Sequence, residues 1–280
     1  MLGEALNKVR NWPRITIYFY QGSKVKFVKE TARNQRLIAS SMAGISRRQA
    51  ILQTLSINSN DRIMDVGCGA GHLVEQLAKA TSGQGQVYAL DPSEDQLAEA
   101  RDRCSDLSNI IFLHGSADNI DLESGVCDIV TSTQAYEYIE DIDAALLEST
   151  RILRSGGSFV NVSILWDYFR FYGPDETLNN LVHDAFKEHC YHQMLPMELP
   201  GKLRGLGYKY IKNESLAFMV SDRDQNSPAR YLETMMANFA VTHGVSKKDV
   251  EDWRVQLTEA EVEGRFGFTS YPVLTSAYLS

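Results

Sequence analysis

The stretch that decides the fold of this 280-residue chain is Asp65-Val66-Gly67-Cys68-Gly69-Ala70-Gly71. It begins inside the β-branched run 62–66 and leads into a helical pattern at 71–81. Glycines between a strand and a helix let the backbone turn tightly and let a ligand approach without interference from Cβ atoms. The stretch therefore predicts a ligand-binding loop at the carboxyl end of a buried strand.

Alternating strand and helix patterns surround this loop and are typical of a parallel sheet built from βαβ units. Strands are predicted at 62–66, 86–90, 110–113, 127–131 and 158–163, with helices at 71–81, 95–104 and 141–153. After an aromatic stretch at 165–172 we expect a helix at 197–206, a strand at 208–219, helices at 228–243 and 246–263, and a final strand at 266–279.

The composition is that of a soluble globular protein, with 44% hydrophobic and 23% charged residues. The sequence contains no run of eighteen apolar residues and no signal-peptide pattern, so we expect a cytoplasmic protein without stable membrane insertion. A net charge of −8 argues against nucleic acid as a partner. Residues 1–50 nevertheless hold ten Lys/Arg against two Asp/Glu, which we interpret as a solvated helical face, leaving contact with an anionic substrate or a membrane surface open.

The cysteines and histidines do not show a metal-binding pattern. Four cysteines lie far apart without a C-x-x-C pair, and only Cys190 is placed where it could face an acceptor molecule. His183, His189 and His192 match no zinc spacing, so no metal is predicted. These three histidines are instead the leading candidates for a general base.

The glycine spacing separates two classes of nucleotide-binding protein. A dinucleotide-binding loop normally reads G-x-G-x-x-G, whereas here the spacing is G-x-G-x-G and His72 stands at the third glycine position. This argues against an NAD-dependent Rossmann oxidoreductase, which we keep as an alternative.

The loop resembles the first motif of class I S-adenosylmethionine-dependent methyltransferases, D-x-G-x-G-x-G. Further motifs follow in the expected order over about a hundred residues: Asp91-Pro92 after the second strand, Gly115-Ser116-Ala117 after the third, the loop from Val130 to Tyr136 after the fourth, and Arg151-Ile152-Leu153-Arg154-Ser155-Gly156-Gly157. The resemblance implies S-adenosylmethionine as cofactor and a Rossmann-like α/β fold: a seven-stranded, mostly parallel sheet with helices on both faces and a helical cap. It also implies that Asp91 holds the ribose hydroxyls.

The resemblance assigns site residues by position. The implied cofactor-binding residues are Asp65, Gly67, Cys68, Gly69, Gly71, Asp91, Pro92, Gln96, Ser116, Ala117 and Thr133. We expect Tyr136 and His189 to be catalytic, and Tyr18, Tyr20, Trp166 and Tyr168 to bind the acceptor. We expect residues 1–50 to form a helical arm, 51–164 the cofactor-binding core, and 165–280 the acceptor-side insertions and the final elements of the sheet.

Within the family, the pattern is most similar to the small-molecule branch of ubiquinone and menaquinone C-methyltransferases and natural-product methyltransferases. The proline pair of nucleic-acid amino-methyltransferases is absent after the fourth strand, where Ser132-Thr133-Gln134-Ala135-Tyr136 stands. The sequence therefore predicts methyl transfer to a small-molecule acceptor and leaves open whether O, N or C is methylated. A non-catalytic S-adenosylmethionine-binding module and a homodimer also remain open.

Overall fold

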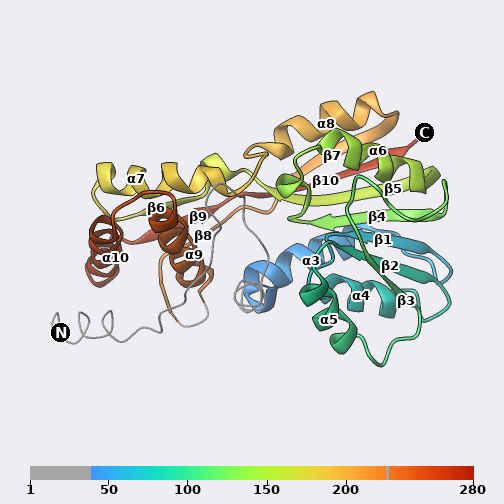
Figure 1. The fold of residues 1–280 in the computed structure, drawn as a ribbon, viewed down its shortest axis with the longest axis horizontal. Helices are drawn as coiled ribbons and strands as arrows, with labels where there is room; N and C mark the ends of the chain where they lie inside the picture. The colour runs from blue at the N-terminus through green and yellow to red at the C-terminus, as the bar shows by residue number, and fades with distance from the viewer. Residues whose placement is uncertain (1–38, 225–226) are drawn as a thin grey trace.

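The computed structural model describes residues 39–224 and 227–280, and its centre is a seven-stranded sheet in the order β3-β2-β1-β4-β5-β10-β7 (Figure 1). The strands are β1 (Arg62–Val66), β2 (Gln86–Asp91), β3 (Ile110–His114), β4 (Cys127–Thr133), β5 (Leu153–Ile164), β7 (Tyr208–Ser215) and β10 (Pro272–Leu279). β1 to β5 pair in parallel, and β10 runs antiparallel to both β5 and β7. The α/β fold with a mostly parallel sheet is confirmed.

Helices cover both faces of the sheet (Figure 1). One face carries α3 (Met42–Thr54), α4 (His72–Ala80) and α5 (Glu94–Arg103), and the other carries α6 (Ile142–Ile152) and α8 (Leu195–Gly205). Each face has its own buried apolar cluster, one including Ile51 and Leu77 and the other including Leu146 and Leu199. Apolar side chains on both faces explain why the central strands read as continuous hydrophobic runs rather than as alternating ones.

Beyond the carboxyl end of β5 lies a second layer, which we call the cap. It contains α7 (Glu176–Phe186), α9 (Pro228–Thr242) and α10 (Lys247–Val262), packed with a three-stranded sheet of β6 (Arg170–Tyr172), β9 (Gly267–Ser270) and β8 (Phe218–Val220) (Figure 1). Three short 3₁₀ turns complete the described elements: η1 (Tyr136–Tyr138), η2 (Trp166–Tyr168) and η3 (Lys187–His189). No helix in the described residues is long and apolar enough to cross a bilayer.

Two of the strands predicted from the sequence are wrong as single elements. The expected strand at 208–219 is divided into β7 and β8, and the expected strand at 266–279 into β9 and β10. The register is the same on both sides of the break, since Val220 pairs with Phe268 and Ser215 with Val273. The two halves belong to different sheets because the neighbouring strand is interrupted: η2 separates β5 from β6.

The cap has an aromatic core of its own. Phe171 on β6 is fully buried, and its ring lies 4.6 Å from that of Phe268 and 5.5 Å from that of Trp253. Asn179 on α7 accepts a hydrogen bond from Trp253 Nε1 at 2.9 Å and donates one to the Phe171 carbonyl oxygen at 2.8 Å. Helices and strands of the cap thereby pack around one residue of a three-residue strand.

We expect Phe171→Ala to lower the free energy of unfolding by about 3–5 kcal/mol, because it removes a buried ring and leaves a cavity. Tyr172→Ala is the matched control, since the neighbouring side chain on the same strand is exposed and its loss should change stability by no more than about 0.5 kcal/mol. Urea unfolding of both variants measures the difference, and equal losses would contradict the importance of this core.

Candidate functional site

A cavity of about 690 Å³ lies at the carboxyl ends of the parallel strands, where the sheet meets the cap. Ten of the eleven residues predicted to bind the cofactor line it: Asp65, Gly67, Cys68, Gly69, Asp91, Pro92, Gln96, Ser116, Ala117 and Thr133. Ligands of open α/β sheets bind in this crevice because the loops after successive parallel strands converge there. The fold thus brings together residues that span almost seventy positions of sequence.

Gly67 and Gly69 serve the loop in different ways. Both have positive φ, +71° and +52°, a conformation that glycine adopts without steric cost. A Cβ on Gly67 would lie 2.2 Å from Cβ of Ala135, so this position must stay bare for the loop after β4 to pack. A Cβ on Gly69 would meet only Gln96 Oε1, at 3.7 Å. Because Gly69 has no side chain, the loop leaves open space on the side of the cavity at this position.

The predicted ligand contact of Gly71 is not supported, because Gly71 does not line the cavity. Its φ is +76°, and a Cβ there would lie 2.9 Å from Cβ of Ala100 on α5. The third glycine of the motif is required for the close approach of α4 and α5.

Asp91 closes the glycine loop onto the end of β2. The amide of Gly69 donates to Oδ2 at 2.9 Å, and the amide of Ser93 donates to Oδ1 at 2.9 Å. Burial raises the pKa of this carboxyl group, while the two backbone hydrogen bonds act in the opposite direction. Each carboxylate oxygen has further lone pairs beyond the one used here, so Asp91 can still accept hydrogen bonds from a ligand.

Asp65 lies beneath the loop at the end of β1. Thr131 on β4 donates a hydrogen bond from Oγ1 to Asp65 Oδ1 at 2.9 Å. Burial raises the pKa of Asp65 from 3.8 to about 7; the Thr131 hydrogen bond opposes the shift and the negative charge of Asp91 adds to it. The floor of the cavity thus holds a carboxyl group that takes up a proton readily.

On the cap side, the cavity is lined by Trp166, which we expected to bind the acceptor, and by His189, which we expected to be catalytic. Their rings meet edge to face with centroids 4.3 Å apart, and His189 also stacks on Phe186 at 4.1 Å. His189 Nδ1 lies 2.7 Å from the Phe186 carbonyl oxygen, which can only accept a hydrogen bond. The neutral ring therefore carries its hydrogen on Nδ1, and Nε2 is its basic nitrogen.

Tyr136 was expected to be catalytic, and the structure contradicts this. Its ring is fully buried among the core residues beside α6, its hydroxyl lies 2.6 Å from Ser149 Oγ, and it does not line the cavity. Successive side chains of a 3₁₀ turn point about 120° apart. In the turn η1 it is Tyr138, two residues later, that lines the cavity.

The other predicted acceptor-side residues differ in outcome. Tyr168 is 53% exposed, packs its ring against Tyr271 at 5.6 Å and does not line the cavity, so its prediction is wrong. It belongs to the turn η2, whose geometry points Trp166 inward and Tyr168 outward. Tyr18 and Tyr20 lie outside the described residues.

The remaining polar candidates of the cap do not line the cavity themselves. His183 Nε2 accepts a hydrogen bond from the Phe171 amide at 3.2 Å, and burial lowers the pKa of His183 to about 3. His192 Nε2 lies 2.9 Å from the Ile139 carbonyl oxygen. Cys190 is buried in the cap core rather than facing the cavity. Within residues 39–224 and 227–280, no three His, Cys, Asp or Glu side chains are grouped as metal ligands would be.

Sequence reasoning missed Arg47 and Arg48 on α3. Both are almost fully buried and line the cavity, so the solvated-face interpretation is wrong for them. Arg47 donates a hydrogen bond to Gln134 Oε1. Burial lowers the pKa of Arg47 to about 10, and the nearby Glu137 carboxylate opposes the shift. Arg47 and Arg48 are adjacent on a helix that also carries Ile51, and their spacing shows no periodicity that would have predicted their burial.

Leu232 and Met235 on α9 were not named individually, although residues 165–280 were expected to supply the acceptor-side insertions. They line the cavity together with Phe169 and Ile164, which end or follow β5. Nearly seventy residues separate Ile164 from Leu232, so no local pattern could have indicated that they share a wall.

We expect Asp65→Asn to become more stable than the wild type, by a difference that grows as the pH rises from about 4 to about 7. The raised pKa means that the folded wild type holds this proton more tightly than the unfolded chain does, so the wild type loses stability as the pH rises through that interval. Asn cannot ionise and can still accept from Thr131. Urea unfolding of both proteins at several pH values measures the difference; a difference independent of pH would contradict the assignment.

Comparison with known proteins gives a consistent family assignment. Residues 64–161 match the family described as "Methyltransferase domain". A demethylmenaquinone methyltransferase of Staphylococcus saprophyticus is 31% identical over 113 residues, which are 40% of this chain and 48% of that protein. One from Geobacillus sp. is 25% identical over 193 residues, 62% of this chain and 82% of that protein. The chain thus spans about half the length of the Staphylococcus relative.

Among solved structures, phosphoethanolamine N-methyltransferase 2 of Haemonchus contortus, in complex with S-adenosyl-L-methionine, superimposes with a TM-score of 0.62. The identity is 16%, and the match covers 93% of this chain and 61% of that one, so it bears on the fold alone. Motif order, strand order and the matched family agree. The chain therefore carries a methyltransferase domain at residues 64–161, within a Rossmann-like fold that is similar to that of class I methyltransferases.

Proposed function

We propose that this protein transfers a methyl group from S-adenosylmethionine to a small, uncharged and largely apolar acceptor. The observation that carries the proposal is the division of one cavity into two chemically different ends. The loops after β1 and β2 supply polar and backbone groups, and the cap supplies aromatic and aliphatic side chains. In this proposal residues 51–164 hold the cofactor, while residues 165–280 complete the sheet and enclose the acceptor.

The residues at the polar end suit the cofactor. Asp91 would accept hydrogen bonds from the ribose hydroxyls through the lone pairs that Gly69 and Ser93 leave available. Gly69 leaves room for the cofactor to approach the loop, because a Cβ at this position would meet no protein atom closer than 3.7 Å. When bound, S-adenosylmethionine supplies an electrophilic methyl group on a positively charged sulfur.

The other end favours an apolar acceptor. Its wall includes Tyr138, Trp166, Phe169, Leu232 and Met235. The only carboxylates among the described residues that line the cavity are Asp65 and Asp91, both at the cofactor end, so an ammonium group on the acceptor side would have no carboxylate partner there. Of the acceptors that the similar proteins are named for, demethylmenaquinone fits this wall better than phosphoethanolamine.

The work of the chain is then to hold the acceptor nucleophile in line with the methyl group and to exclude water. His189 is the proposed base where the nucleophile must lose a proton, because it is the one cap histidine of the three candidates that lines the cavity. The net charge of −8 supports a small-molecule acceptor rather than nucleic acid. We also propose the cytoplasm as the place of action.

Methyl transfer from labelled S-adenosylmethionine to reduced demethylmenaquinone tests the proposal, with phosphoethanolamine as the charged comparison. We expect label in the quinol and none in phosphoethanolamine. Adenosylhomocysteine should raise the melting temperature in proportion to RT ln(1 + [L]/Kd), while NAD and NADP should not. Stabilisation by NAD alone would overturn the cofactor assignment, and adenosylhomocysteine binding without any transfer would favour a non-catalytic module.

Asp91→Ala tests the ribose contact. Charged hydrogen bonds contribute about 1.5–3 kcal/mol each, so the affinity for adenosylhomocysteine should fall at least about tenfold. Asp95→Ala, an exposed carboxylate at the start of α5, is the control and should bind as the wild type does. Calorimetry that finds wild-type affinity in Asp91→Ala would remove Asp91 from the site.

A further inference from the structure

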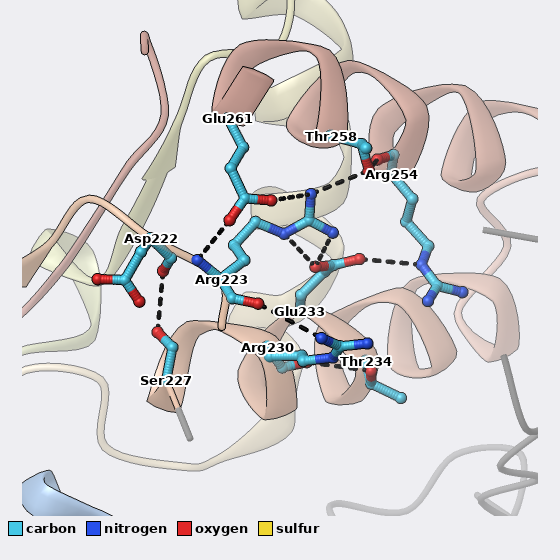
Figure 2. Close-up of polar contacts among 9 residues, drawn as sticks. All are labelled: Asp222, Arg223, Ser227, Arg230, Glu233, Thr234, Arg254, Thr258 and Glu261. Carbon is cyan, nitrogen blue, oxygen red and sulfur yellow. Dashed lines mark hydrogen bonds and ion pairs between the residues drawn. The ribbon is translucent and has the colours of Figure 1, made fainter. Parts of the chain in front are cut away.

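A network of four charged side chains joins the segment before α9 to α9 and α10 (Figure 2). Arg223 donates to Glu233 Oε2 from Nε at 2.9 Å and from Nη2 at 2.5 Å, and Arg254 Nε donates to Glu233 Oε1 at 3.0 Å. Glu261 pairs with Arg223 at 3.8 Å and accepts a hydrogen bond from the Arg223 amide at 2.6 Å. Two positive and two negative charges thus balance inside the cap.

The centre of the network is withdrawn from water. The side chain of Glu233 is 0% exposed and that of Arg223 is 3% exposed. Burying such a pair costs much of the attraction that it gains, so apolar residues of similar volume could hold the same helices together at least as well. Stability alone therefore does not explain why these charged residues are buried here. Hydrogen bonds and ion pairs are directional, so they can fix the position of one helix along its neighbour, which non-directional apolar contacts do not.

The helix that the network fixes is a wall of the cavity. Pro228, Leu232 and Met235 line the cavity from the first two turns of α9, and Glu233 follows Leu232 directly. Arg223 is also tied to α9 through its backbone, because Arg230 Nη1 donates to the Arg223 carbonyl oxygen at 3.5 Å. Ser227 Oγ, at the N-cap of α9, donates to the Asp222 carbonyl oxygen at 2.9 Å (Figure 2).

We infer that Glu233 is a positioning residue: held between Arg223 and Arg254, it sets the place of Leu232 and Met235 and thereby how tightly the acceptor fits. This inference rests on the proposed function for the identity of the occupant. The network touches neither the glycine loop nor Asp91 and acts only on the acceptor side.

Glu233→Gln tests the inference in the full-length protein, because it keeps the shape of the side chain and removes the charge that both arginines face. Arg254→Met is a milder second variant that leaves the Arg223–Glu233 pair intact. Lys248→Ala is the matched control, since it breaks an ion pair with Asp252 on the outer face of α10, where the two side chains are 82% and 46% exposed.

Hydrogen exchange, cofactor affinity and acceptor kinetics are the readouts. In Glu233→Gln we expect the amides of 229–236 to exchange at least about tenfold faster while β1 and β4 are unchanged. Adenosylhomocysteine affinity should stay within about twofold, and KM for reduced demethylmenaquinone should rise at least about fivefold with little change in kcat. Arg254→Met should show smaller effects in the same direction, and Lys248→Ala none.

Several results would overturn the inference. Unchanged exchange in 229–236 would show that α9 is placed by its apolar contacts. Equal acceleration of exchange in the sheet, together with loss of adenosylhomocysteine affinity, would show a merely stabilising network. If Glu233→Gln does not fold, Arg254→Met decides by the same criteria. A wild type that transfers no methyl group to the quinol would contradict the proposed acceptor, while the exchange result would still decide whether the network positions α9.

Discussion

The two-stranded antiparallel ribbon of residues 208–220 and 267–279 is the constraint on which the architecture depends. One end of the ribbon, β7 and β10, completes the large sheet, and the other end, β8 and β9, forms two strands of the cap sheet. The pairing of β8 with β9 keeps the register that β7 and β10 have at the break between them. The same two segments of chain are therefore hydrogen-bonded to each other in the large sheet and in the cap sheet. The cap is therefore placed beyond the carboxyl end of β5 by backbone pairing as well as by side-chain packing.

This placement creates the cavity and divides its chemistry. A parallel sheet presents its loops at one edge, and here the glycine loop lies beside the carboxylates at the ends of β1 and β2. The cap presents the buried aromatic side of η2 and the apolar face of α9 to the same edge. The polar and the apolar parts of the cavity wall are thus supplied by different parts of the chain.

Several ionisable groups are buried around this edge, and each is handled differently. Among the described residues, the Asp65 carboxyl accepts a side-chain hydrogen bond from Thr131 alone, and burial raises its pKa to about 7. Glu137 is fully buried with a pKa raised to about 7 by burial, although Ser163 donates to Oε2 at 2.8 Å and Arg47 lies near. Glu233 instead meets two arginines. A buried carboxyl group with few hydrogen-bonding or charged partners thus binds a proton more readily, whereas one that faces two arginines forms ion pairs.

The sequence by itself determined the alternation of strands and helices from residue 62 to residue 164, the glycine loop and the position of Asp91 at a strand end. These are local features, since period, turn chemistry and spacing along the chain specify them. Only the tertiary structure decided that Gly71 faces Ala100, that Tyr138 rather than Tyr136 reaches the cavity, that Arg47 is buried, and that Leu232 lines the same cavity as the glycine loop. Each of these depends on which distant segment packs against the residue and on which way a short turn points its side chains, and neither is encoded in the pattern of neighbouring residues.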